Sequence, residues 1–352
     1  MPRALQIIVT RSFAGAERYV STLAAALPGA GWDVTVVGGS PDAMPSSLDG
    51  SGVAWLPGGS PREAARAVAG AGRFDVCHVH MTYAEAVGLA LRGRHRAPVV
   101  ATRHFAARRG ASAVGRLLAG PIGRGLAAEI AISEFVASHL DRRPIRVVVN
   151  GVAGRPLGWQ PDNRVVLVLQ RLEPEKDTLT AVRGWHRSGL AARGWRLRLV
   201  GAGAQRSALE EHVRREGVAG VEFVGWVADV QAELSGAGML LATAPAEPLG
   251  LSVLEGLAAG VPVVAAASGG HLETAATVPG ALLFTPGDVD GVADLLRRLA
   301  EDDGLRATLS SASRATHAQR FGLDRHVQQV VEVYDTLRRP AGSSSRLGSG
   351  AR

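Results

Sequence analysis

Lysine is nearly absent from this sequence of 352 residues. Of its 39 basic residues only one, Lys176, is a lysine, so the others are arginines. A codon bias toward arginine explains why lysine is rare, but it leaves the position of Lys176 a coincidence. The alternative is that this position needs a compact point charge, which a planar guanidinium cannot imitate. The segment around Lys176 is therefore a candidate site.

Cysteine and long apolar runs are scarce as well. With Cys77 alone, the chain forms no internal disulfide, which suits a reducing compartment. No run approaches the roughly 18 apolar residues of a membrane span, and the first apolar run is too short for a signal peptide. We therefore expect a bacterial, cytoplasmic protein. The small, polar residues of 340–352 predict a disordered tail.

Acidic residues are missing from residues 92–124. The stretch holds eight arginines, at positions 92, 94, 96, 103, 108, 109, 116 and 124. Two interpretations stay open: a solvated basic face, or a surface that attracts a phosphorylated acceptor or the inner face of the plasma membrane. Phe105 is its one Phe, Tyr or Trp residue, so nucleic acid, which uses aromatic stacking, is not an expected partner.

Short apolar runs alternate with helical segments along the whole chain. Runs such as "LQIIVT", "FDVCHVH" and "RVVLVLQ" are apolar without strict alternation, which is typical of parallel strands covered on both faces. The pattern predicts an α/β protein with two Rossmann-like, doubly wound domains that face each other across a cleft. We expect domains over 1–150 and 151–320, a last helix over 321–339, and a linker over 150–164.

Two glycine-containing loops follow predicted strands. In "RSFAGAER", Gly15 opens a helix and lets a backbone approach an anion closely. In "LVGAGAQR", Gly201 and Gly203 resemble the start of a dinucleotide fingerprint. Position 206 is an arginine where that fingerprint has its third glycine, so binding of a nicotinamide cofactor is not expected.

The loop "QRLEPEKD" brings cations to the end of a predicted strand. Arg171 ends the strand, and Lys176 stands just before a helix expected to start at Asp177 or Thr178. Both cations would lie at the edge of the sheet where ligands bind in open α/β folds. An ordinary exposed loop is the alternative.

The stretch "AEPLGLSVLEGLAAG" places a carboxylate on each side of a helix start. Glu247 precedes the predicted helix and Glu255 lies within it, while Gly250 and Leu251 supply free backbone amides. A salt bridge to a neighbouring arginine is the alternative role for either carboxylate. Cations, amides and carboxylates together suit a diphosphate flanked by hydroxyl groups, as in a nucleotide sugar.

Three other patterns could be mistaken for active sites. The "GDVDG" of residues 287–291 imitates a metal-binding Asp-x-Asp but precedes a helix, which favours capping. The "HVH" of residues 78–80 puts two imidazoles on one strand face, with no third ligand evident for zinc. Ser133 lacks the Gly-x-Ser-x-Gly setting of a nucleophile and is predicted to cap a helix.

The sequence resembles the retaining glycosyltransferases of family 4, which have the GT-B fold. The resemblance rests on "QRLEPEKD", the Glu–seven residues–Glu spacing of "EPLGLSVLE", "GVPVV" and the "GGHLE" turn, in this order. It covers nearly the whole chain and is strongest from "NGVA" to "SGGHLE". It implies that the first domain receives the acceptor, that the second binds the nucleotide sugar, and that the last helix crosses back to the first domain.

The resemblance also implies roles for individual residues. Arg171 and Lys176 would bind the donor diphosphate and stabilise the departing nucleotide, and Glu247 would contact the transferred sugar. In the second domain, Glu255 would contact the ribose, the amides of Gly250 and Leu251 the distal phosphate or sugar, and the backbone near Val227 the base. In the first domain, Gly15 would contact the phosphates and His104 the reacting sugar.

The expected activity is hexosyl transfer from a UDP-, GDP- or similar nucleotide sugar to an acceptor hydroxyl, with retention of anomeric configuration. The acceptor would be a small molecule, a saccharide or a lipid-linked compound. Since Arg171 and Lys176 supply positive charge, no metal or other cofactor is expected. A nucleotide-sugar epimerase on the same fold, and a catalytically silent partner that binds nucleotide sugars, remain alternatives.

Overall fold

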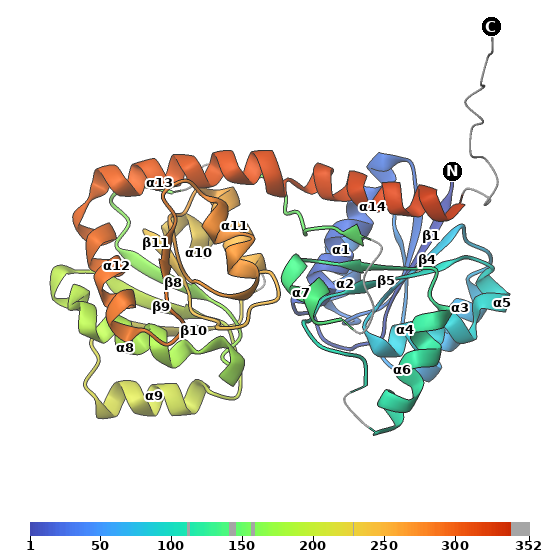
Figure 1. Cartoon of the computed structure of the whole chain (residues 1–352), viewed down its shortest axis with the longest axis horizontal. Helices are drawn as coiled ribbons and strands as arrows, with labels where there is room; N and C mark the ends of the chain where they lie inside the picture. Colours follow the sequence, from blue (N-terminus) through green and yellow to red (C-terminus); the bar gives the residue numbers. More distant parts are fainter. Residues whose placement is uncertain (111–112, 141–145, 156–158, 228, 339–352) are drawn as a thin grey trace, which may run out of the picture. The chain divides into compact units, whose positions relative to one another are not determined.

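The computed structural model describes residues 1–110, 113–140, 146–155, 159–227 and 229–338 (Figure 1). The chain forms two compact units. Unit 1 comprises residues 1–131, 140–148 and 327 onward, and unit 2 comprises 132–139 and 149–326. The division differs from a single boundary at residue 150 because residues 132–139 pack on the 268–274 turn of unit 2. The predicted tail lies outside the described residues.

Unit 1 is a seven-stranded parallel sheet with helices on both faces. Its strands are β1 (Arg3–Ile8), β2 (Asp33–Gly38), β3 (Ala54–Leu56), β4 (Val76–His80), β5 (Val99–Arg103), β6 (Ala128–Ala131) and β7 (Arg146–Val147). Its helices are α1 (Gly15–Ala26), η1 (Leu27–Ala30), α2 (Ala43–Leu48), α3 (Pro61–Gly70), α4 (Thr82–Ala90), α5 (Arg92–His95), α6 (Ala113–Gly125) and most of α14 (Leu323–Arg338).

Unit 2 repeats the plan with six parallel strands. They are β8 (Val165–Leu169), β9 (Arg196–Val200), β10 (Val221–Gly225), β11 (Met239–Ala242), β12 (Val263–Ala266) and β13 (Leu282–Phe284). The α-helices are α7 (Glu134–Ser138), α8 (Thr178–Ser188), α9 (Arg206–Arg215), α10 (Gln231–Gly236), α11 (Leu251–Ala259), α12 (Val289–Glu301) and α13 (Asp303–Thr316). Shorter turns are η2 (Pro174–Lys176), η3 (Leu190–Arg193), η4 (Gly269–Leu272), η5 (Ala275–Thr277) and η6 (His317–Phe321).

The strand orders confirm the predicted doubly wound α/β class. They are β3-β2-β1-β4-β5-β6-β7 in unit 1 and β10-β9-β8-β11-β12-β13 in unit 2, and each predicted apolar run forms a parallel strand. In unit 1 the strands are added to one side of β1 and then, from β4 onward, to its other side. In unit 2 the same switch occurs between β8 and β11. Loops diverge at the carboxyl ends of such strand pairs, and ligands bind there in open sheets.

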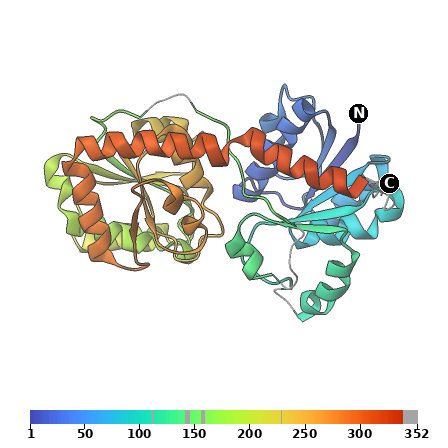
Figure 2. The ribbon, with the colours of Figure 1, turned by 45° about the horizontal axis from the view of Figure 1, so that its top comes forward.

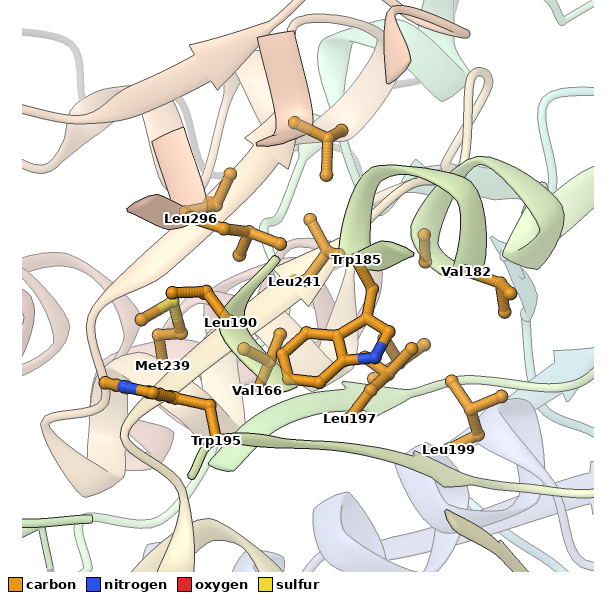
Figure 3. Packing of buried hydrophobic residues seen from close by; sticks show 14 of the residues in the cluster. Val166, Val182, Trp185, Leu190, Trp195, Leu197, Leu199, Met239, Leu241 and Leu296 are labelled. Atoms are coloured by element: carbon orange, nitrogen blue, oxygen red, sulfur yellow. The ribbon is translucent and has the colours of Figure 1, made fainter. Parts of the chain in front are cut away.

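The core of unit 2 explains why its strands are continuously apolar. Trp185 of α8 and Leu296 of α12 pack on Val166 and Leu197 of the sheet (Figure 3), and all four side chains are buried. Helices α8, α9 and α12 contribute to this cluster, so they cover one face of the sheet. Burial of each large apolar side chain contributes about 1.5–3 kcal/mol.

The helices near the C-terminus follow one another along the chain. The red ribbon of Figure 2 shows α13 and α14, which are joined by the π-helical turn η6. The first residues of α14 belong to unit 2 and its residues from Val327 onward to unit 1. Among the described residues, no helix is both long and apolar enough to cross a membrane.

Candidate active site

The two predicted cations follow β8, and each is paired with a carboxylate. The Arg171 guanidinium lies 2.6 Å from Glu175 Oε1, and both side chains are about half exposed. The Lys176 ammonium lies 2.5 Å from Glu247 Oε2, and these side chains are only 15% and 16% exposed. The salt bridge weighed as an alternative for Glu247 therefore exists, with Lys176 as its partner and not an arginine.

The backbone of Lys176 is fixed from two loops. Its carbonyl accepts hydrogen bonds from Gln170 Nε2 and Thr243 Oγ1, each over 3.0 Å. Gln170 follows β8 and Thr243 follows β11, so both central strands hold the lysine in place. Asp177 then adopts a left-handed conformation (φ 48°) as the N-cap of α8, which begins at Thr178 as expected.

The loop that carries Glu247 is held by hydrogen bonds to its carbonyl groups. The amide of Gly270 donates to the Glu247 carbonyl (2.7 Å), and the Thr274 hydroxyl to that of Leu249 (3.2 Å). Ser268 and Ser133 donate in the same way to Pro245 and to Pro248, the latter over 2.6 Å. The position of the Glu247 carboxylate thus depends on the turn over residues 268–274.

Two glycines of that turn are required by close approach. A Cβ on Gly270 would lie 2.3 Å from Leu249 Cα, and one on Gly269, whose φ is +54°, would lie 2.6 Å from the Glu247 carbonyl oxygen. At the end of the turn, the Glu273 carboxylate accepts from the amides of Glu134 and Phe135, both over 2.7 Å. The "GGHLE" motif therefore supports the Glu247 loop and fastens the start of α7.

Helix α11 begins beside the Lys176–Glu247 pair and has no capping side chain. Its N-cap is Gly250, with φ +95°, so the first amide groups, beginning with Leu251, are open to an anion. Glu255 lies one turn into the helix and is half-buried. The imidazole of His271 packs under Gly250, where a Cβ would meet its Cδ2 at 3.2 Å.

His271 also belongs to this site, although its place in the sequence did not single it out. Its Nδ1 donates to the carbonyl of Ala266 (3.2 Å). Burial lowers the pKa of His271 and outweighs the nearby Glu247, which raises it, so the ring is neutral at pH 7. His271 is the histidine of the "GGHLE" motif, and its contact with Gly250 is what shows that it belongs to the site.

The glycines of "LVGAGAQR" have a packing role. A Cβ on Gly201 would lie 1.9 Å from the carbonyl oxygen of Gln170, and one on Gly203 would lie 2.3 Å from that of Leu172. The loop after β9 therefore lies directly against the loop that carries Arg171. Val227, expected near the base, follows β10 and is half-buried.

Gly15 is the first residue of α1, after the loop that follows β1. Glu17, which the sequence analysis missed, shapes this loop. Its buried carboxylate accepts from Thr10 Oγ1 (2.7 Å), Ser12 Oγ (2.8 Å) and the amide of Ala14 (3.0 Å). Burial alone raises the pKa of Glu17, but these hydrogen bonds outweigh it and hold the pKa below its usual value.

His104 follows β5 and is 8% exposed. Its Nε2 lies 3.1 Å from Nδ1 of His80, the last residue of β4. The "HVH" pair thus has a neighbouring third imidazole, which the sequence analysis did not find. Among the described residues, no cluster of His, Cys, Asp and Glu side chains forms a metal site.

Part of the arginine-rich stretch is neutralised by acids that lie outside it in sequence. Arg109 is buried and donates to Glu85 (2.6 Å) and to Glu129. Arg103 lies 3.9 Å from Glu85 and 3.6 Å from Glu129. Both acids lie outside residues 92–124 in sequence. Exposed arginines of the stretch are Arg92, Arg94, Arg96, Arg108 and Arg124, and the side chain of Arg116 lies outside the described part.

The two predicted helix caps are confirmed. Asp288 of "GDVDG" accepts from the amide of Gly291 (2.9 Å) at the start of α12. Ser133 accepts from the amide of Val136 (3.0 Å) at the start of α7. Both side chains therefore satisfy amide groups that the first turn of a helix leaves without a partner.

Comparisons with known proteins identify the relatives of this chain. The family model of the group 1 glycosyl transferases matches residues 154–316, and that of Glycosyltransferase Family 4 matches residues 13–153. The D-inositol 3-phosphate glycosyltransferase of Kribbella flavida is 31% identical over 316 residues, which cover 77% of this chain and 73% of that protein. The lipopolysaccharide core biosynthesis glycosyltransferase LpsD of Rhizobium meliloti is 29% identical over 203 residues, which cover 55% of this chain and 58% of LpsD.

A solved structure gives the fold. HepE of Anabaena, in complex with UDP and glucose, superimposes with a TM-score of 0.80 at 21% identity, over 96% of this chain and 100% of HepE. Two parallel-sheet units of this kind are the GT-B architecture. The two family models and the Kribbella relative together show that the chain belongs to the family 4 glycosyltransferases.

Proposed function

We propose that this protein transfers a hexosyl group from a nucleoside diphosphate sugar to an acceptor hydroxyl, with retention of configuration and without a divalent metal. One observation carries the proposal. The Lys176–Glu247 pair lies at the carboxyl ends of β8 and β11 and is 2.5 Å apart, beside the uncapped start of α11. An ammonium, a carboxylate and free amides at one sheet edge match the phosphates and hydroxyls of such a donor.

The two cations would act on the leaving nucleotide. Cleavage of the glycosidic bond places new negative charge on the β-phosphate and positive charge on the sugar. Lys176 and Arg171 stabilise that new negative charge, in place of a metal ion. In the structure both cations are paired with carboxylates, Glu247 and Glu175. Donor binding therefore exchanges these partners for phosphate oxygens.

The remaining residues of unit 2 would hold the rest of the donor. Glu247, released from Lys176, would accept from hydroxyls of the transferred hexose, and Glu255 from the ribose. The amides of Gly250 and Leu251 would bind the distal phosphate or sugar, and the backbone near Val227 the base. These assignments follow the family resemblance, and the location of each residue at the carboxyl edge of the sheet supports them.

Unit 1 would contribute Gly15 to the phosphates and His104 to the reacting sugar. Both lie at the carboxyl edge of its sheet, after β1 and β5. We propose a phosphorylated or lipid-linked acceptor. The relatives support this class, since one is named for D-inositol 3-phosphate and the other for lipopolysaccharide core biosynthesis. A cytoplasmic protein that binds the inner membrane face through the exposed arginines of 92–124 fits such an acceptor.

A donor panel tests the proposal. UDP- and GDP-sugars are screened by thermal shift, in which a ligand at 100 times its Kd adds about 2.7 kcal/mol to the free energy of unfolding. The donor that stabilises the protein is then incubated with candidate acceptors, and the anomeric configuration of the product is read by NMR. An inverted product contradicts retention. An epimerised donor without any acceptor would indicate an epimerase instead.

Metal independence is tested separately with EDTA. We expect transfer to continue at its full rate, because Arg171 and Lys176 already supply positive charge at the diphosphate. Activity that EDTA abolishes and Mn²⁺ restores would contradict this part of the proposal.

A further inference from the structure

One face of the unit 1 sheet carries a row of buried polar side chains. Gln6 of β1, His78 and His80 of β4 and Thr102 of β5 are each at most 1% exposed. The opposite face is apolar and packs on α3 and α4. Burying polar groups costs free energy unless they find hydrogen-bond partners. The side chains of this row must therefore find hydrogen-bond partners among themselves or serve a function that offsets the cost of burying them.

The row leads to His104 through hydrogen bonds. His80 Nε2 lies 3.3 Å from Gln6 Oε1, and His80 Nδ1 lies 3.1 Å from His104 Nε2. Tyr19 of α1 packs edge-on against both imidazoles, with ring centroids at 5.7 Å from His80 and 4.8 Å from His104. The two rings are thus held between a helix and the strands.

The protons in the hydrogen-bond network of Gln6, His80 and His104 can be assigned. Burial lowers the pKa of His80 well below its usual value, and His78 and His104 add to the effect, so His80 is neutral and carries one N–H. With its amide oxygen toward His80, Gln6 can only accept, and this orientation puts the proton of His80 on Nε2. Its Nδ1 is then an acceptor, and the hydrogen bond to it requires a proton on His104 Nε2.

We propose that His80 is a positioning residue that holds His104 in its Nε2-protonated tautomer. Nδ1 becomes the acceptor nitrogen of His104, so this histidine accepts from a sugar hydroxyl and does not donate to it. The link to catalysis rests on the proposed function, whereas the tautomer follows from contacts within the protein. Gln6 completes the chain from the central strand β1.

Imidazole nitrogens report the tautomer directly. Long-range ¹H–¹⁵N NMR is recorded on protein labelled at histidine, with His104 assigned from the spectrum of His104→Gln. In the wild type we expect a proton on His104 Nε2. His80→Asn keeps an acceptor oxygen near the place of Nδ1 and is expected to preserve this state, whereas His80→Leu removes it and gives a mixture of tautomers.

A matched control separates positioning from stability. His95 is also buried. It forms hydrogen bonds to Gly88 and Ala97 and is not part of the hydrogen-bond network of Gln6, His80 and His104. His95→Leu is expected to lower the free energy of unfolding as His80→Leu does, while the tautomer of His104 stays unchanged. A His104 protonated on Nδ1 in the wild type, or an unchanged tautomer in His80→Leu, would overturn the proposal.

Kinetics then connect the tautomer to transfer. His80→Leu is expected to lower kcat by up to about a hundredfold with little change in the donor KM, since misplacing one catalytic contact has effects of this size. His80→Asn should recover much of the loss, and equal activity of His80→Leu and wild type would refute the catalytic role. If the wild type transfers no sugar, the proposed function fails while the NMR result still decides the tautomer.

Discussion

At the scale of single residues, Lys176 is enclosed where Arg171 is not. Its ammonium has a carboxylate partner at 2.5 Å and its side chain is 15% exposed, against 53% for Arg171. An enclosed ammonium can turn its three donors from Glu247 to a phosphate oxygen without moving its backbone. A planar guanidinium needs more room and a fixed fork geometry. If Lys176 binds the donor phosphate as proposed, these differences favour a lysine over an arginine at this position.

Lys176→Arg is therefore predicted to lose most turnover although the charge is kept. Removing one preorganised contact of this kind costs about 3 kcal/mol, or on the order of a hundredfold in kcat. Lys176→Met serves as the comparison because it removes the charge altogether. If the arginine variant behaves like the wild type and not like the methionine variant, the codon-bias explanation returns.

Glu17 gives a prediction about pH. Its folded pKa lies below the usual 4.5, so its contribution to stability is present above pH 4.5 and is lost as the pH falls through the folded value. Glu17→Gln is predicted to lower the free energy of unfolding by about 2 kcal/mol at pH 7, since it weakens a charged acceptor of three hydrogen bonds. Urea unfolding at several pH values measures the difference between variant and wild type. A difference that does not shrink on acidification would contradict the assignment.

At the scale of elements, the 268–274 turn is a support for the site and not a site of its own. It acts on the proposed donor site through His271, which packs under Gly250, and through its hydrogen bonds to the Glu247 loop. Its hydrogen bonds go to the carbonyls of Pro245, Glu247 and Leu249, so a displaced turn moves the carboxylate of Glu247. This support gives a physical reason why Gly269, Gly270 and Glu273 follow the Glu247–Glu255 pair in the sequence.

Gly270→Ala tests this support. The new Cβ would lie 2.3 Å from Leu249 Cα, a backbone atom that cannot move aside cheaply. We predict a loss of about 1–3 kcal/mol in stability, typical of overpacking, with weaker donor binding as well. Gly236→Ala at the end of α10 is the control, because nothing lies within 4 Å of its Cβ. Equal donor affinity for both variants would show that the turn does not position Glu247.

The strands and the site loops could be predicted from sequence, but several side chains could not. Apolar runs are local, so the parallel strands and the helix starts at Thr178 and Leu251 follow from neighbouring residues. The polar face of unit 1 depends on strand register, which aligns His80 with Thr102, and sequence does not state register. The acids that neutralise Arg109 are likewise distant in sequence.

At the scale of the whole molecule, the net charge of +7 is concentrated in the first 150 residues. The structure removes Arg103 and Arg109 from the surface charge, because Glu85 and Glu129 neutralise them. Arg109→Gln would leave two buried carboxylates with one fewer partner, which is costly. A variant meant to test surface attraction must therefore leave Arg109 in place.

The basic surface is defined here as the exposed arginines Arg92, Arg94, Arg96, Arg108 and Arg124. We predict that it binds anionic vesicles at low salt and releases them at high salt. Each arginine near such a surface contributes about 1 kcal/mol, and the attraction fades over roughly 8 Å at physiological salt. Co-sedimentation with anionic and with neutral vesicles measures the binding.

Changing all five residues to Gln is predicted to abolish this binding without unfolding the protein. The control removes five exposed arginines of unit 2 instead, namely Arg187, Arg193, Arg196, Arg214 and Arg215. Because both variants lose the same net charge, a difference between them reflects the location of the charge. A wild type that ignores anionic vesicles at low salt refutes membrane binding. If the five-fold basic-surface variant also glycosylates its acceptor at the normal rate, an anionic acceptor held by these arginines is refuted too, and the arginines are a solvated face.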